Sequence, residues 1–91
     1  MAARSGQITV TTAGTAVTGP NQQGRAFQLI GHPDNTDTTW VGNDDAGDVT
    51  SSNGYTLQPA VQPLVIAVGN LSDLRFDADV NGEKVCWIKL D

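Results

Sequence analysis

Residues 73–90 read DLRFDADVNGEKVCWIKL and consist of two extended segments separated by Asn81-Gly82. Apolar and polar side chains alternate in the first segment, Asp73–Ala78, and a second extended run covers Glu83–Leu90. A period of two is typical of half-buried strands. Asn-Gly favours a two-residue type I′ turn, because both central positions of that turn need a positive φ. The segment therefore predicts a β-hairpin.

The rest of the chain shows similar short extended segments, interrupted by Gly, Pro and Asn, with no helical periodicity over a useful length. We expect further strands at Gln7–Thr12, Thr15–Thr18, Arg25–Gly31, Thr38–Gly42, from Tyr55 onward, and at Gln62–Val68. The last of these is rich in β-branched residues, so we expect it to be central in its sheet. The pattern predicts an all-β protein, a small antiparallel β-sandwich or barrel of about seven to eight short strands.

The length of 91 residues is that of one domain. Residues 1–6 are small and polar and are expected to form a flexible N-terminal arm, with 7–91 as a single β-sandwich domain. A domain of this size has a thin core and often gains stability by assembly. The lone cysteine, Cys86, excludes a disulfide within the chain. We therefore expect a homo-oligomer.

The charge balance is acidic: ten acidic and five basic residues give a net charge of −5. The basic residues are spread along the chain and do not form a cluster that could neutralise phosphates. This distribution disfavours both nucleic acid and anionic membranes as partners. The first residues lack the apolar stretch of a signal peptide, so we expect a protein made in a cytoplasm.

The chain offers few groups equipped for chemistry. The acidic residues of 34–48 do not match the spacing of an EF-hand calcium loop, and residues 43–54 are better explained as the longest loop. His32 has no second histidine to join it in a metal site. A nucleophile–base pair of Cys86 with His32 lacks a third orienting group. We therefore expect no catalytic residues, no metal and no cofactor.

The last expected strand has apolar side chains on both faces. Val85 and Trp87 point one way, whereas Cys86, Ile88 and Leu90 point the other way. One face must meet the core, and the other is covered by a neighbouring element or contacts another subunit. Aromatic residues are common interface anchors. The candidate residues for an oligomer or ligand interface are Trp40, Tyr55, Trp87 and Ile88.

Several segments, taken in order, resemble short β-rich virion proteins of tailed bacteriophages, a group that includes capsid decoration (cement) and head-fibre-type proteins. The resemblance is carried by residues 11–17, 35–42, 53–59, 70–74 and 82–87, and it covers about Gln7 to Trp87. The chain departs from the group where Ala60 follows Pro59, a position at which glycine is common, and in its more acidic loop at 44–48.

The resemblance implies a non-enzymatic capsid decoration protein located on the surface of the virion after synthesis in the host cytoplasm. It implies the major capsid protein of the same phage as partner, and a dimer or trimer of this chain. We expect the N-terminal arm to contact the shell through Arg4, Ser5 and Gln7. The alternatives are a phage tail, baseplate or fibre subunit, and a carbohydrate-binding module with Trp40 and Tyr55 as stacking platforms. A small enzyme would need polar groups around His32 or Cys86.

Overall fold

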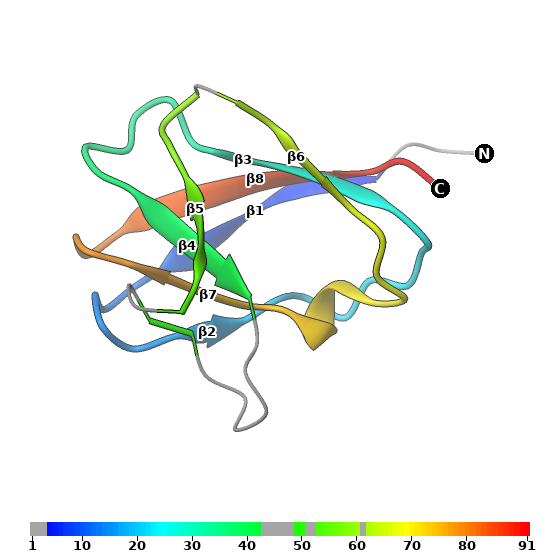
Figure 1. The fold of residues 1–91 in the computed structure, drawn as a ribbon, viewed down its shortest axis with the longest axis horizontal. Coiled ribbons are helices and arrows are strands. Elements are labelled where there is room, and N and C mark those ends of the chain that lie inside the picture. Colours follow the sequence, from blue (N-terminus) through cyan, green and yellow to red (C-terminus); the bar gives the residue numbers. More distant parts are fainter. Residues whose placement is uncertain (1–3, 43–48, 51–52, 61) are drawn as a thin grey trace.

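A computed structural model describes residues 4–42, 49–50, 53–60 and 62–91. It confirms the expected fold class, because two four-stranded antiparallel sheets pack face to face as a β-sandwich (Figure 1). Sheet 1 has the strand order β1 (Ser5–Val10), β8 (Glu83–Lys89), β3 (Phe27–Gly31) and β6 (Leu64–Ile66). Sheet 2 has the order β2 (Val17–Thr18), β7 (Arg75–Ala78), β4 (Thr39–Gly42) and β5 (Tyr55–Leu57). A short 3-10 turn, η1 (Leu71–Asp73), precedes β7.

The predicted hairpin at Asn81-Gly82 is wrong. The turn connects β7 in sheet 2 to β8 in sheet 1, and β8 pairs with β1 and β3 instead of with β7. Gly82 has a φ of +83°. In the described part of the chain, Ala60 is the one non-glycine residue with a positive φ, so the φ of Asn81 is not positive. Asn81 therefore lacks the conformation of a type I′ turn. Its side-chain oxygen instead accepts a hydrogen bond from the backbone N–H of Ala13, at 2.7 Å.

The expected N-terminal arm is also too long. Ser5 and Gly6 are the first two residues of β1, paired with Ile88 and Trp87. The carbonyl of Arg4 accepts a hydrogen bond from the backbone N–H of Lys89, at 2.8 Å. Ser5 and Gly6, which we expected in the flexible arm because of their small side chains, are therefore part of sheet 1. Residues 1–3 lie outside the described part of the chain.

The strand expected to be central in its sheet is an edge strand. β6 covers only Leu64–Ile66 and pairs with β3 alone. β-branched residues favour a strand at the edge as well as at the centre of a sheet, so this composition predicts the strand but not its position. The centre of sheet 1 is formed by β8 and β3, which pair over five residues.

The core lies between the two sheets and follows the alternation of side chains along each strand. Phe27 and Phe76 are fully buried and face the core from sheets 1 and 2. The ring of Trp87 packs edge-to-face against Phe27, with the ring centroids 6.3 Å apart. The other fully buried residues with large side chains are Leu29, Leu57, Leu71, Val10, Val41, Val49, Val85 and Thr39.

Two buried polar residues fix the connection between β3 and β4 to the end of sheet 1. The Oε1 atom of Glu83 accepts hydrogen bonds from the backbone N–H and hydroxyl of Thr36 and from the backbone N–H of Asp37, at 2.9–3.1 Å. The side chain of Asn35 exchanges two hydrogen bonds with the backbone of Lys84, at 2.7 and 2.8 Å. Side-chain hydrogen bonds therefore hold the β3–β4 connection in place, whereas backbone pairing holds the strands of the sheet.

Candidate binding surfaces

The outer face of sheet 1 is the side of that sheet turned away from the core. Register fixes its composition, because alternate residues of paired strands share a face. One row across the sheet runs through Ser5, Ile88, Gln28 and Val65. The next row contains Gln7, Cys86 and Ile30. Thr9 and Lys84 form the third row.

This face is partly apolar and carries little charge. Val65 is 59% exposed and Ile88 is 37% exposed, and both lie in the same row. Leu90, just beyond β8, is 49% exposed. Lys84 is the one charged side chain among the outward-facing strand residues of sheet 1 that the structure describes. Depletion of charge beside exposed aliphatic side chains is typical of the centre of a protein–protein interface.

Three of the predicted site residues meet on this face. Ser5 lies beside Ile88, and Gln7 lies beside Cys86. Arg4 precedes β1 and is exposed. Trp87 points the opposite way, and its partly buried ring packs against the core. Sequence reasoning did not single out Ile30 and Val65. The register places Ile30 beside Cys86, and it places Val65 beside Gln28, in the same row as Ile88.

Trp40 and Tyr55 do not form the predicted stacking platform. Trp40 pairs with Thr56, whereas Tyr55 pairs with Val41, so the two aromatic side chains point to opposite faces of sheet 2. Trp40 is only 7% exposed, and its β-carbon approaches Gly54 so closely that no side chain would fit there. Tyr55 is 62% exposed. A sugar ring could not stack on both at once.

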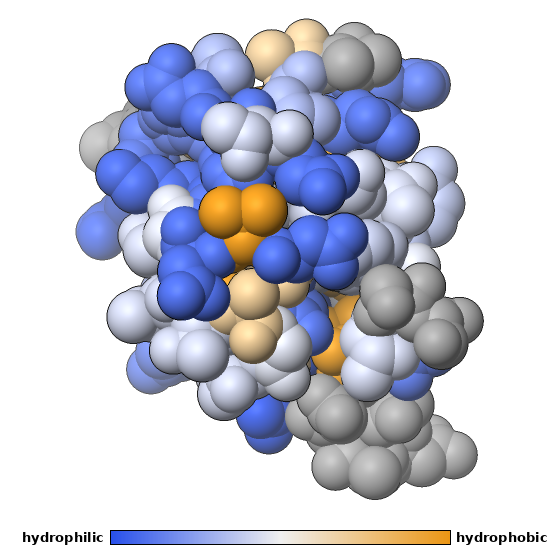
Figure 2. All heavy atoms as spheres, turned by 90° about the vertical axis from the view of Figure 1, so that its left-hand side faces the viewer, coloured by the Kyte–Doolittle hydropathy of each residue, from blue (hydrophilic) through white to orange (hydrophobic). Residues whose placement is uncertain are grey.

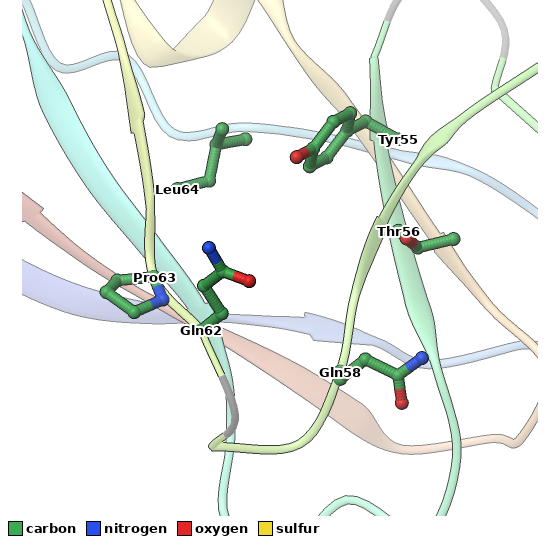
Figure 3. Close-up of a pocket in the computed structure, with 6 residues that line it drawn as sticks. All are labelled: Tyr55, Thr56, Gln58, Gln62, Pro63 and Leu64. Carbon is green, nitrogen blue, oxygen red and sulfur yellow. The ribbon is translucent and has the colours of Figure 1, made fainter.

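A shallow hollow of about 130 Å³ lies between the edge strands β5 and β6, where the two sheets separate (Figure 3). Tyr55, Gln62 and Leu64 point into this space, and Gln58 and Thr56 lie along its β5 side. Its lining residues carry no charge. It offers amides and a phenol for hydrogen bonding, but no titratable pair for acid–base chemistry.

Cys86 and His32 do not resemble an activated pair. Burial raises the pKa of the Cys86 thiol above its ordinary value, and the positive charge of Lys84 opposes part of that rise. The thiol form, which is a poor nucleophile, is therefore favoured at neutral pH. The Nδ1 atom of His32 accepts a hydrogen bond from the backbone N–H of Asp34, at 3.0 Å. His32 thus helps to shape the β3–β4 connection.

Among the described residues, no three His, Cys, Asp or Glu side chains lie close enough together to hold a metal ion. Asp34 and Asp37 are exposed, and Asp44, Asp45 and Asp48 lie outside the part of the chain that the structure describes. Within that same part, no helix is long and apolar enough to cross a membrane.

A second hollow, of about 310 Å³, lies on the outer side of sheet 2. It is lined by Ala13, Gly14, Trp40, Thr50, Asp77, Ala78 and Asp79. The alternation in the sequence predicts that Asp77 points away from the core, which the register confirms. Asp77 is nevertheless only 4% exposed, because the β1–β2 connection packs beside it. No local sequence pattern predicts this contact.

Comparisons of this chain with protein-family models, with curated proteins and with solved structures found no match. The surfaces described above are therefore the basis for assigning a function.

Proposed function

We propose that this chain is a non-enzymatic virion component, a bacteriophage capsid decoration (cement) protein that binds the head shell through the outer face of sheet 1. The observation that carries the proposal is the chemistry of that face. Val65, Ile88 and Leu90 are exposed there beside uncharged polar residues, although the chain has five basic and ten acidic residues. A partly apolar face whose strands carry one charged side chain, Lys84, is suited to being buried against another protein.

Binding of this kind stabilises a shell by mass action. A protein that binds the assembled capsid, but not its loose subunits, shifts the equilibrium toward the assembled state. The same face, or the free edge of β1, is available for a dimer or trimer around a symmetry axis. Ser5 and Gln7 contribute to the contact as strand residues of this face, not as part of a separate arm.

The test uses empty expanded capsids assembled from the major capsid protein of the same phage. We expect the wild-type protein to sediment with these capsids and a Val65→Lys/Ile88→Lys variant to remain in the supernatant, because two buried ammonium groups oppose binding. The matched control is Val80→Lys, a residue of similar exposure (40%) in the β7–β8 connection. Circular dichroism checks that all variants are folded.

Two results would contradict the proposal. One is wild-type protein that does not sediment with capsids, and the other is double-variant protein that sediments as well as the Val80→Lys control. Sedimentation with purified tails, but not with capsids, would favour a tail, baseplate or fibre subunit. Light scattering on the same samples gives the oligomeric state and shows whether the double substitution changes it.

A further inference from the structure

β1 is an edge strand without the features that usually protect a sheet edge. It forms one edge of sheet 1 (Figure 1), is six residues long, and contains neither a charged residue nor a proline. Natural edge strands are commonly short, or carry prolines and charges, which prevent pairing with another chain. A long, uncharged edge therefore indicates a strand that is available for pairing.

The other three edge strands of the described sandwich show this protection. β2, β5 and β6 are only two or three residues long. Each also has a proline within two residues of one end: Pro20 follows β2, Pro59 follows β5, and Pro63 precedes β6. Length and proline placement thus distinguish β1 from the other edges.

The hydrogen bonds of β1 show which of its backbone groups face outward. The carbonyls of Arg4 and Val10 accept hydrogen bonds from the chain segment that contains β8. Backbone groups of alternate residues point to opposite sides of a strand, so those of Ser5, Gln7 and Thr9 point away from β8. Among the described strands β8 is the only one paired with β1. The N–H and C=O groups of these three residues therefore have no strand partner in the described part of the chain.

Charge also favours this edge for contact between two copies of the chain. The net charge is −5, so two copies repel each other unless their contact excludes carboxylates. The exposed side chains of β1, those of Ser5, Gln7 and Thr9, are uncharged. The end of the molecule that carries the β1–β2, β3–β4 and β7–β8 connections is mostly hydrophilic (Figure 2), and Asp34 and Asp37 are exposed there. That end is therefore less suited to self-association.

We propose that β1 pairs with β1 of a second copy of this chain, antiparallel, about a two-fold axis at Gln7. This register places Ser5 opposite Thr9 of the partner subunit and Gln7 opposite Gln7 of the partner subunit. All three outward-facing residues then exchange backbone hydrogen bonds, and each bond occurs twice, as in any interface with two-fold symmetry. Ser–Thr pairs across strands add to the stability of the contact.

A second copy is favoured over a strand of another protein because it satisfies every requirement of this edge. It supplies a strand of equal length, with outward-facing groups at the same spacing and with no charge. The pairing joins two copies of sheet 1 into one continuous sheet and adds burial to a domain with a thin core. It makes specific the self-association that the proposed function allows, but it does not require capsid binding.

The first experiment is sedimentation velocity over a range of protein concentrations. We expect the wild type to form a species with twice the mass of one chain. Gln7→Pro removes an outward-facing N–H from each copy but no bond to β8, so it should weaken dimerisation by at least about tenfold. Gln7→Lys places two ammonium groups opposite each other and should weaken it by about fivefold. Gln28→Lys, the same substitution in the central strand β3, should leave the dimer unchanged.

Amide hydrogen exchange gives a signature that is specific to edge pairing. In the dimer, the amides of Ser5 and Thr9 should be protected. In Gln7→Lys, at a concentration at which this variant is monomeric, they should exchange at least about tenfold faster. The amides of Gly6 and Ile8, which face β8, should stay protected in both proteins. Circular dichroism checks the fold, and Gln7→Lys decides the test if Gln7→Pro is unfolded.

A monomeric wild type would overturn the proposal. A dimer that both Gln7 variants leave unchanged, but that Val65→Lys/Ile88→Lys disrupts, would overturn it as well. If the wild type is monomeric and its Ser5 and Thr9 amides become protected only when empty capsids are added, β1 pairs with the shell and not with a second copy. Capsid sedimentation is a separate measurement: a monomer that sediments overturns the dimer alone, whereas a dimer that does not sediment contradicts the proposed function alone.

Discussion

The indole ring of Trp87 lies directly over Gly6. A β-carbon at Gly6 would be 3.1–3.2 Å from three atoms of that ring, closer than side chains normally approach. The two residues are cross-strand neighbours in β1 and β8. The ring of Trp87 also packs edge-to-face against the ring of Phe27. The glycine therefore provides the space into which the tryptophan packs, and the first residues of β1 are part of the packed structure.

Gly6→Ala should destabilise the domain by about 1–3 kcal/mol, because the added methyl group forces the indole to move. Gly69→Ala is the matched control, because a β-carbon there would meet nothing within 4 Å. Urea unfolding followed by circular dichroism measures both. Equal midpoints for the two variants would show that the Trp87 ring accommodates the methyl group without strain.

Trp87→Ala should cost about 3 kcal/mol through the loss of packing against Phe27, at the lower end of the range for a tryptophan because the ring is only partly buried. In the Trp87→Ala background, Gly6→Ala should no longer destabilise, since the clash needs both groups. A double-mutant cycle measures this coupling. Additive effects would place the cause of the Gly6→Ala effect outside this contact.

Glu83→Ala should destabilise by about 3 kcal/mol, because three hydrogen bonds to one buried carboxylate oxygen are lost together. Hydrogen exchange should accelerate at the amides of Thr36 and Asp37. Asp34→Ala, in the same connection but exposed, is expected to change stability by no more than about 0.5 kcal/mol. Unchanged exchange at Thr36 in Glu83→Ala would contradict the anchoring role.

Stability should fall at alkaline pH in a way that depends on Cys86. Its folded-state pKa is raised by burial, so the unfolded chain loses the thiol proton first as the pH rises through the ordinary value of 9.0. This contribution is fully present below that pH and is lost as the pH rises through the folded-state pKa. The difference in stability between wild type and Cys86→Ala should therefore shrink above pH 9, measured by urea unfolding. A constant difference would rule out this linkage.

Asn81→Gly separates the observed turn from a hairpin turn. A type I′ turn would tolerate glycine at this position, but here the Asn81 side chain accepts the hydrogen bond from Ala13. We expect a loss of about 1 kcal/mol. Gly82→Ala should cost a similar amount, about 1 kcal/mol, because of the φ of +83°. An Asn81→Gly variant as stable as the wild type would show that the hydrogen bond from Ala13 does not contribute to stability.

Local alternation predicts much of the fold and little of the candidate sites. The expected strands at Arg25–Gly31 and Thr38–Gly42 contain β3 and β4 with errors of one or two residues, because side-chain period is a local property. The pairing partner of a strand is not a local property. Asn81-Gly82 predicts a turn, but nothing in the local sequence indicates that the chain passes there from sheet 2 to sheet 1. Exposure follows pairing, so the opposite directions of Trp40 and Tyr55 came only from the β4–β5 register.

The two ends of the described chain lie side by side. Arg4 and Lys89 are joined by a backbone hydrogen bond, and both ends leave sheet 1 at the same edge of the molecule (Figure 1). A few linking residues would therefore close the chain into a ring without disturbing any strand pairing. For the same reason, the domain can be inserted into a surface loop of a host protein. The host chain would enter and leave it at one point, as it would at the base of an ordinary loop.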